Sequence, residues 1–210
     1  MIVYLMRHGE TDWNKERRLQ GRSDIPLNAF GIELAEKTAE GMKEIPFDRA
    51  FSSPLDRAYT TARIVIGDRP VEVVKDDRLQ EICFGPSEGQ CFDRAKQDPT
   101  HPLHNFFCHP GEYHPVDGAE SFAEARARAK EFFDECIFPL EGTCENVLVV
   151  AHGALNRSIL NAIAGIPDSD FWRISLANCA VSILKVENGK LSILEEQKVY
   201  YGGEPVNGRP

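Results

Sequence analysis

Residues 2–11 read IVYLMRHGET, an apolar run that stops abruptly at Arg7-His8-Gly9. The apolar residues 2–6 favour β-structure, and a run without polar alternation is typical of a strand buried on both faces. Such strands belong to parallel sheets, whose ligands bind beyond the carboxyl ends of the strands. The residues that directly follow each strand are therefore the first candidates for a functional site.

Two further predicted strands also run into polar residues. Arg49–Ser52 is followed by Ser53-Pro54, and Asn146–Ala151 is followed by His152-Gly153. We interpret Ser53-Pro54 as the start of a helix, because a capping hydroxyl precedes a proline at the first helical position. Residues from three separate parts of the chain would thus meet at one edge of the sheet.

Segments with helical spacing of apolar residues separate the strands, and Ser121-x-x-Glu124 is a capping box that opens another helix. Asn188-Gly189 between two β-forming runs predicts a hairpin. The pattern predicts an α/β fold, a three-layer sandwich with a mostly parallel sheet, helices on both faces and a C-terminal β-hairpin. It rests on the strands Ile2–Met6, Arg49–Ser52, Val71–Val74, Asn146–Ala151, Val181–Val186 and Leu191–Glu195, and on helices near 31–43, 54–66, 121–136 and 154–164.

No repeat, low-complexity tract or linker divides the 210 residues, so we predict a single domain over 1–210. Residues 82–118 are predicted to form a lid-like insertion within it. The Gly- and Pro-rich tail, 201–210, is predicted to be loose.

The composition is that of an ordinary soluble protein, with 42% apolar and 27% charged residues. A net charge of -9 argues against a nucleic-acid or anionic-membrane partner, because both need basic patches. The apolar run at 1–6 is too short for a signal peptide or a membrane span. Six scattered cysteines without a CxxC spacing are interpreted as reduced thiols, which predicts a cytoplasmic location.

The residue types at the strand ends suit a phosphoryl group. Arg7 and Arg57 present planar forks of donors that match phosphate oxygens, and they stay charged. Backbone N–H groups at 53–55, at the predicted helix start, would favour an anion. His8 and His152 would be partly unprotonated near neutral pH and could act as nucleophiles. These groups supply the positive charge themselves, so no metal is implied.

These stretches resemble the histidine phosphatase superfamily, also called the phosphoglycerate mutase-like family. Phosphatases of the family often carry a tryptophan just before a Glu-Gly pair, where this chain has Ser87. The matching residues span 5–153 and include Arg7-His8-Gly9-Glu10-Thr11, Asn14, Gln20-Gly21, Ser53-Pro54-Leu55-Asp56-Arg57, Leu79 with Glu81, Glu88-Gly89 and Ala151-His152-Gly153.

The resemblance implies a role for each matching residue and no cofactor. His8 would be the nucleophile that becomes phosphohistidine. Glu81 would donate a proton to the leaving oxygen and then activate water. Phosphoryl oxygens and developing charge would be held by Arg7, Arg57 and His152. The candidates for substrate binding are Asn14, Gly21, Ser53 and Gly153.

The implied activity is metal-independent hydrolysis of a phosphate monoester of a small phosphorylated metabolite, through a phosphohistidine, with release of inorganic phosphate. The main alternative is a cofactor-dependent phosphoglycerate mutase. Mutases of the family have a longer insertion between the acid and the second histidine, with extra basic residues; here 82–118 has only Arg94 and Lys96 as basic residues. The other alternative is a non-catalytic phosphate-binding protein, which would not need both a nucleophile and an acid.

Residues 98–117 also contain Cys108 and the histidines His101, His104, His109 and His114. Such residues are common zinc ligands, but their spacing fits no standard zinc pattern, and prolines interrupt it. We favour a lid that includes Phe106, Phe107 and Tyr113. Aromatic walls are typical of small-ligand pockets and would suit a substrate with a ring or apolar body.

Overall fold

The computed structural model describes residues 1–202 of the chain. Within this range the strands are β1 (Ile2–Arg7), β2 (Arg49–Ser52), β3 (Val73–Lys75), β4 (Asn146–Ala151), β5 (Val181–Glu187) and β6 (Lys190–Lys198). The α-helices are α1 (Asp12–Lys15), α2 (Ala29–Gly41), α3 (Asp56–Ile66), α4 (Phe92–Gln97), α5 (His104–Cys108), α6 (Phe122–Phe132) and α7 (Gly153–Ala164).

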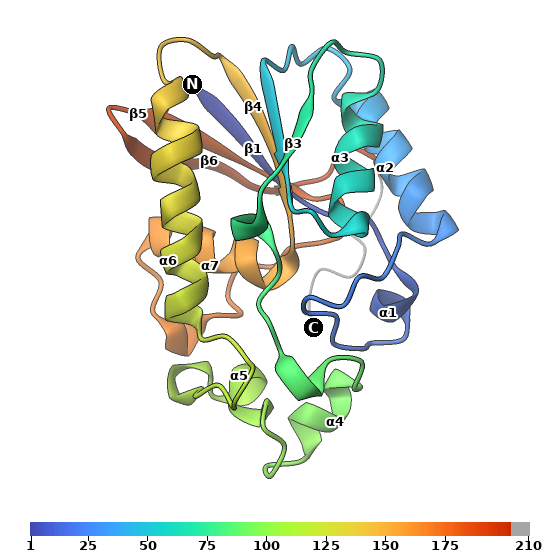
Figure 1. Cartoon of the computed structure of the whole chain (residues 1–210), viewed down its shortest axis with the longest axis vertical. Helices are drawn as coiled ribbons and strands as arrows, with labels where there is room; N and C mark the ends of the chain where they lie inside the picture. The colour runs from blue at the N-terminus through green and yellow to red at the C-terminus, as the bar shows by residue number, and fades with distance from the viewer. Residues whose placement is uncertain (203–210) are drawn as a thin grey trace.

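The strands form one six-stranded sheet in the order β3-β2-β4-β1-β5-β6 (Figure 1). The first four strands in this order pair in parallel, and β5 and β6 add an antiparallel hairpin at one edge. In the register between β1 and β4, Arg7 lies opposite Ala151. Because both strands end at the same level, His8 and His152 follow them side by side.

Helices cover both faces of the sheet because side chains alternate between the two sides of each strand. Val147, Val149 and Ala151 of β4 pack into the core cluster that also contains residues of α6 and α7. Leu148 and Val150 pack on the opposite face, in the cluster with residues of α2 and α3. Figure 1 shows α6 and α7 on one side of the sheet and α2 and α3 on the other. The predicted α/β sandwich is confirmed.

The predicted hairpin is also confirmed. Asn188 and Gly189 both have positive φ angles, of 54° and 67°, which suit the tight two-residue turn between twisted strands. The capping box at Ser121 is present, with Glu124 bonding back to the Ser121 amide. The predicted loose tail falls partly on 203–210, which lies outside the described residues.

The start of α3 was predicted wrongly. The helix begins at Asp56, with Leu55 at the N-cap, and not at Pro54. Ser53 does not cap it: its hydroxyl accepts a hydrogen bond from the Leu55 amide at 3.3 Å and lies 2.8 Å from a ring nitrogen of His152. The Ser53 hydroxyl thus takes part in a tertiary contact with His152, although the local sequence pattern predicts that it caps the helix.

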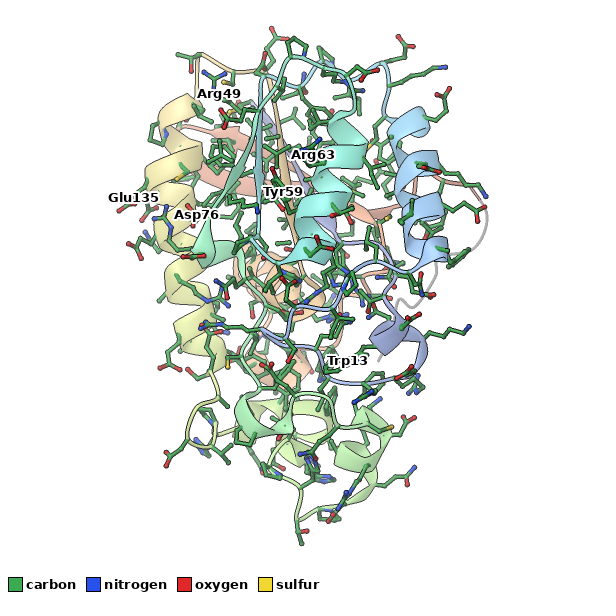
Figure 2. All side chains as sticks on the ribbon, turned by 45° about the vertical axis from the view of Figure 1, so that its right-hand side comes forward. Trp13, Arg49, Tyr59, Arg63, Asp76 and Glu135 are labelled. Atoms are coloured by element: carbon green, nitrogen blue, oxygen red, sulfur yellow. The ribbon has the colours of Figure 1, made fainter. Side chains whose placement is uncertain are left out.

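The segment 82–118 lies beyond the carboxyl ends of the parallel strands and holds α4 and α5 (Figure 1). Figure 2 shows Arg49, at the start of β2, near the top of the molecule, and Trp13 of α1 below its middle. Backbone hydrogen bonds tie the segment to the loop after α1: the Leu19 amide donates to the Gln90 carbonyl, and the Gly89 amide donates to the Leu19 carbonyl. In addition, Arg17 forms a bidentate ion pair with Asp93. Its interpretation as a lid within a single domain stays a prediction.

All six cysteines are free thiols. Among residues 1–202, none of the helices has the length and apolar character needed to cross a membrane.

Candidate functional site

A cavity of about 120 Å³ opens at the carboxyl ends of β1 and β4. Its lining brings together seven of the residues predicted from the sequence, which come from strand ends, loops and helix starts. They are Arg7, His8, Asn14, Gly21, Arg57, Glu81 and Gly153. Ser53 and His152 are fully buried and lie behind this lining, against the His8 side of the cavity.

His8 is held so that one ring nitrogen stays available. Its Nδ1 lies 2.6 Å from the Gly9 carbonyl oxygen, which can only accept, so Nδ1 carries the proton and Nε2 keeps its lone pair. The pKa of His8 is lowered well below its usual range, first by burial and then by the charges of Arg57 and Arg7. The ring is therefore neutral, with Nε2 making no hydrogen bond among the described residues.

The backbone of the His8 loop is fixed as firmly as the ring. The Asn178 side chain donates to the carbonyl oxygens of His8 and Gly9, at 3.0 and 3.1 Å. The Gly9 amide donates to the Thr61 hydroxyl at 3.0 Å. The nucleophile candidate is thus positioned by α3 and by the loop before β5, both remote from it in sequence.

His152 lies beside His8, with ring centroids 5.2 Å apart. Its Nε2 is 2.8 Å from the Ser53 hydroxyl, which already accepts a bond from Leu55 and still has a proton to give. The other nitrogen, Nδ1, is buried and has no partner among residues 1–202. Burial, followed by Arg57 and His8, lowers the pKa of His152 well below its usual range.

Arg57 is completely buried, and its guanidinium is held by backbone carbonyl groups. It donates to Gly21 at 2.7 Å and to Ser23 at 2.8 Å, while its Nε has no partner within the described residues. Burial lowers the pKa of Arg57 to about 10, which leaves it charged at neutral pH. Arg7 donates to the Leu176 carbonyl at 2.6 Å. Two guanidinium groups therefore reach the cavity, one from the end of β1 and one from the first turn of α3.

Gly21 shows why a glycine is needed in this loop. Its φ angle is +54°, and a Cβ at this position would lie 2.1 Å from a carboxylate oxygen of Glu88. That carboxylate accepts bonds from the amides of Arg22 and Ser23 and holds the loop against the segment 82–118. A side chain at 21 would strain the backbone and push the Glu88 carboxylate away from the loop whose carbonyl groups hold Arg57.

Glu81 is buried and binds the start of α7. Its carboxylate accepts hydrogen bonds from the amides of Ala154 at 3.0 Å and Leu155 at 2.9 Å, as well as from Ile82 at 2.9 Å. A helix N-terminus attracts anionic groups, so α7 fixes Glu81 at the cavity wall. By contrast, the amides predicted to be free at 53–55 are not free: Ser53 donates to Val150, Leu55 donates to Ser53, and Pro54 has no N–H.

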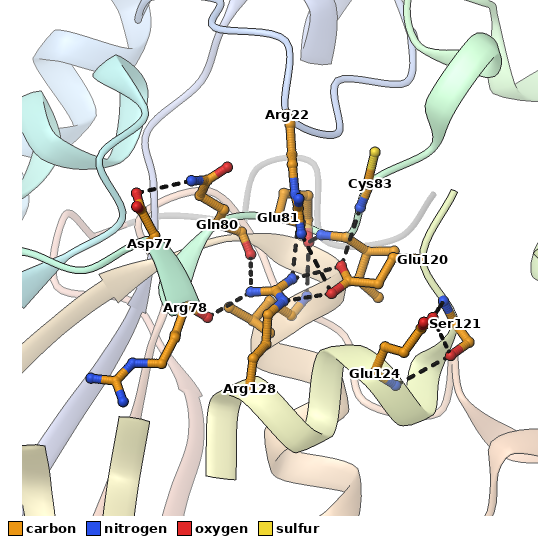
Figure 3. Close-up of polar contacts among 12 residues, drawn as sticks. Arg22, Asp77, Arg78, Gln80, Glu81, Cys83, Glu120, Ser121, Glu124 and Arg128 are labelled. Carbon is orange, nitrogen blue, oxygen red and sulfur yellow. Dashed lines mark hydrogen bonds and ion pairs between the residues drawn. The ribbon is translucent and has the colours of Figure 1, made fainter. Parts of the chain in front are cut away.

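The backbone that carries Glu81 is clamped by Arg128 of α6 (Figure 3). The guanidinium donates to the carbonyl oxygens of Arg78, Gln80 and Glu81 at 2.6, 2.7 and 3.2 Å. Both oxygens of Glu120 accept from the same guanidinium, at 2.6 and 2.8 Å. A planar fork with five donors can satisfy all these acceptors at once, which an ammonium group cannot do.

Asn14 points its carbonyl oxygen away from the ligand space. Its Oδ1 accepts bonds from the Thr11 amide and hydroxyl, both at 3.1 Å, in a capping box at the start of α1. The Nδ2 group makes no hydrogen bond among the described residues, and the residue lines the cavity. The amide group of Asn14 therefore offers a donor to a bound anion.

Phe106 and Phe107, which the sequence predicts as part of an aromatic lid, line the cavity, but most of the outer wall was not predicted. Phe92 stacks on Phe107 at 5.9 Å, and Phe107 stacks on Trp172 at 5.4 Å. Arg157 of α7 lies over the Trp172 ring at 4.7 Å. No motif marks these residues, although an arginine in the buried stretch 153–161 was a usable signal. The additional lining residues are Arg17, Arg18, Leu19, Gln20, Phe84, Phe92, Phe106, Phe107, Ala154, Arg157 and Trp172.

The four histidines of the segment 98–117 do not form one cluster, although the rings of His104 and His109 lie 5.9 Å apart. His101 contacts the Gln90 side chain and the Leu103 amide, and His104 contacts the Ala95 carbonyl. In the part of the chain that the structure describes, no three His, Cys, Asp or Glu side chains form a group that could hold a metal ion.

The lowered pKa values of His8 and His152 predict how stability depends on pH. The unfolded chain binds more protons than the folded chain once the pH falls below about 6.5, the ordinary histidine value. The free energy of unfolding without bound anion should therefore be level from pH 8 to 7 and decrease below about 6.5, by up to about 1.4 kcal/mol per pH unit for each histidine. Denaturant titrations at a series of pH values measure this.

In the same titrations, His152→Asn should give a shallower dependence. The matched control is His114→Asn, at an exposed position, which should keep the wild-type slope. If the free energy of unfolding depended on pH with the same slope in all three proteins, the lowered pKa of His152 would be contradicted.

Comparison with known proteins agrees with this geometry. The chain matches the histidine phosphatase superfamily (branch 1) over residues 3–198. A probable phosphoglycerate mutase GpmB of Enterobacter sp. strain 638 is 33% identical over 180 residues, which cover 86% of this chain and 82% of the relative. Bacillus stearothermophilus YhfR has a similar structure, with a TM-score of 0.88, 32% identity and coverage of 96% of this chain and 99% of that one.

A phosphoserine phosphatase of Entamoeba histolytica, solved in complex with 3-phosphoglyceric acid, has a TM-score of 0.81 and 27% identity. The similarity covers 95% of this chain and 98% of that one. Motifs, site geometry and these comparisons lead to one conclusion: the chain belongs to the histidine phosphatase superfamily.

Proposed function

We propose that the protein is a phosphomonoester hydrolase that acts on a small phosphorylated metabolite through a phosphohistidine at Nε2 of His8. The observation that carries the proposal is the state of that atom. A neutral histidine, with its Nδ1 proton fixed by Gly9, presents an unprotonated Nε2 to a cavity whose lining includes Arg7 and Arg57. A lone pair beside positive charge is what attack on a phosphoryl group requires.

In the first step, Nε2 attacks phosphorus and the ester P–O bond breaks. The leaving oxygen takes a proton from Glu81, so the alcohol departs neutral. In the second step, water gives a proton to Glu81 and its oxygen attacks phosphorus. The P–N bond breaks, which restores His8 and releases inorganic phosphate. Both steps conserve charge and protons, and the residues act mainly by position and electrostatics.

The phosphoryl oxygens would be bound by Arg7, Arg57, the Nδ2 group of Asn14 and the Gly153 amide. His152 would add its Nδ1–H, because the Ser53 hydroxyl can donate to Nε2 and so keep the proton on Nδ1. This gives Ser53 a supporting role in place of the direct contact predicted from the sequence. The arginines supply the charge that a metal would otherwise supply, which supports metal-independent catalysis. The cytoplasmic location that the sequence predicts is kept as part of the proposal.

Phosphoglycerate mutase activity is the second candidate, and a specific observation favours it. Besides Arg7 and Arg57, three further arginines outside the segment 82–118 line the cavity, namely Arg17, Arg18 and Arg157. The basic residues counted from the sequence, Arg94 and Lys96, both lie within that segment, so these three arginines weaken the case against a mutase. The Enterobacter relative also bears a mutase name. The two activities share the first step and differ in whether water or a second hydroxyl group attacks the phosphohistidine.

The nucleophile is tested by trapping. Stopping turnover of a phosphate monoester with alkali should leave a base-stable, acid-labile phosphoryl group on His8, and His8→Ala should lower kcat by several orders of magnitude. A His8→Ala variant that keeps near wild-type turnover contradicts the mechanism, and zero turnover of every monoester by the wild-type protein would favour a binding protein.

Activity of the wild-type protein should survive exhaustive chelation. Adding 3-phosphoglycerate with bisphosphoglycerate distinguishes a mutase.

The role of Glu81 is tested with two leaving groups. An alkoxide needs a proton as it leaves, whereas a nitrophenolate needs little help. Glu81→Gln should therefore slow an alkyl phosphate by at least ~10²-fold while slowing nitrophenyl phosphate far less. Equal effects on the two substrates would mean that the proton comes from another group, and Glu10 and Glu88 would be examined next.

The clamp on the Glu81 backbone is tested with Arg128→Lys. Loss of the planar fork should displace the Glu81 carboxylate. We expect kcat for an alkyl phosphate to fall by roughly 10- to 100-fold, because small misplacements of a catalytic group are costly. Like Glu81→Gln, it should affect nitrophenyl phosphate less. The matched control is Arg126→Lys, two residues earlier on α6, where the arginine pairs with Asp168 away from the clamp. If both variants behaved alike, Arg128 would have no positioning role.

A further inference from the structure

Arg157 is a buried cation that the proposed reaction does not use. It lies on α7, and only 4% of its surface is exposed. Its Nε donates to the Ile174 carbonyl at 2.7 Å, and its Nη1 donates to the Gly153 carbonyl at 3.3 Å. Its Nη2 makes no hydrogen bond among residues 1–202, and the residue lines the cavity. The two N–H groups of Nη2 are therefore available at the cavity wall.

The charge of Arg157 is not neutralised by an ion pair with any carboxylate in the described part of the chain. Burial, followed by the charge of Arg7, lowers the pKa of this guanidinium to about 9. A buried cation without an anionic partner costs free energy, which an incoming anion can recover. Trp172, 4.7 Å from the guanidinium carbon, limits access of water and so strengthens the attraction.

Arg157 lies next to the phosphoryl site without being part of it. Gly153 separates the two groups: its carbonyl accepts from Arg157, and a Cβ on it would lie 3.3 Å from Nε of Arg7. An anion held by Arg157 would therefore lie close to a phosphoryl group held by Arg7. The two negative charges must be separated by a short chain of atoms within one small molecule.

A carboxylate suits this position better than a second phosphate. A phosphoryl group has three oxygens to satisfy, whereas Arg157 offers one unused nitrogen. The cavity has a volume of about 120 Å³, which also favours a compact substrate. We propose that Nη2 of Arg157 binds a carboxylate of the substrate, so that the protein prefers small phosphate monoesters that also carry a carboxylic acid. This inference rests on the proposed phosphatase function.

The test uses two pairs of phosphate monoesters that differ in the carboxylate. 3-Phosphoglycerate is compared with glycerol 3-phosphate, and O-phosphoserine with O-phosphoethanolamine. The wild-type protein should have the higher kcat/KM for the acid in each pair. Arg157→Gln should reduce that preference by roughly 10- to 100-fold, the usual effect of losing a hydrogen bond to a charged group. Arg157→Lys, which keeps the charge, should retain part of it.

Arg17→Gln is the matched control. Arg17 also lines the cavity, but its charge is already paired with Asp93, so this variant should change the preference much less. If Arg157→Gln slows both members of each pair equally, Arg157 is only a structural link between α7 and Ile174, and the proposal is overturned. If Arg157→Gln weakens inhibition by vanadate as strongly as it lowers kcat/KM for the acids, Arg157 belongs to the phosphoryl site, which also overturns the proposal.

Binding measurements separate this inference from the proposed function. Calorimetry with His8→Ala, which cannot form phosphohistidine, should show tighter binding of 3-phosphoglycerate than of glycerol 3-phosphate. The difference should disappear in His8→Ala/Arg157→Gln. If the wild-type protein hydrolyses no monoester but this binding difference holds, the proposed function is wrong and the carboxylate site stands. Equal binding of both compounds to His8→Ala overturns the site whatever the activity.

Discussion

Buried guanidinium groups held by backbone carbonyls are the constraint on which the rest of the site depends. Arg57 is completely buried and donates to the carbonyls of Gly21 and Ser23, and Arg157 donates to those of Gly153 and Ile174. A carboxylate partner would neutralise such a charge, whereas a carbonyl dipole only orients it. A protein with a net charge of -9 thereby keeps a locally positive cavity. The same bonds fix the loops that form the cavity wall.

The state of the histidines follows from these charges. Arg57 lowers the pKa of both His8 and His152, in addition to the effect of burial. In the proposed reaction, positive charge that would attract a phosphoryl group thus also keeps His8 unprotonated, so one arrangement would satisfy both needs. The start of α7 adds the third group of the site, because its amides hold the Glu81 carboxylate at the cavity. Arg128 of α6 fixes the backbone that carries Glu81.

The inner site could be predicted from the sequence because its residues directly follow buried strands. The register of β1 against β4 makes His8 and His152 neighbours once both strands are recognised. Ser53 was misplaced because a local capping pattern competes with a tertiary bond to His152, 99 residues away in the chain. The aromatic wall could be predicted only in part: Phe106 and Phe107 were expected from the sequence, whereas Phe92 and Trp172 were not. It is formed by packing between the segment 82–118 and Trp172, so it supplies the apolar surface that Ser87 does not.

The choice between water and a second hydroxyl group depends on how long the alcohol stays after the ester bond breaks. An alcohol held through a carboxylate on Arg157 remains beside the phosphohistidine, which favours return of the phosphoryl group. Arg157, however, offers one unused nitrogen where a bidentate fork would offer two, and bidentate contacts are the stronger ones. A single contact at the end of a small cavity lets the alcohol leave and water enter. Weak retention of the carboxylate is therefore the property that would make this arrangement a phosphatase.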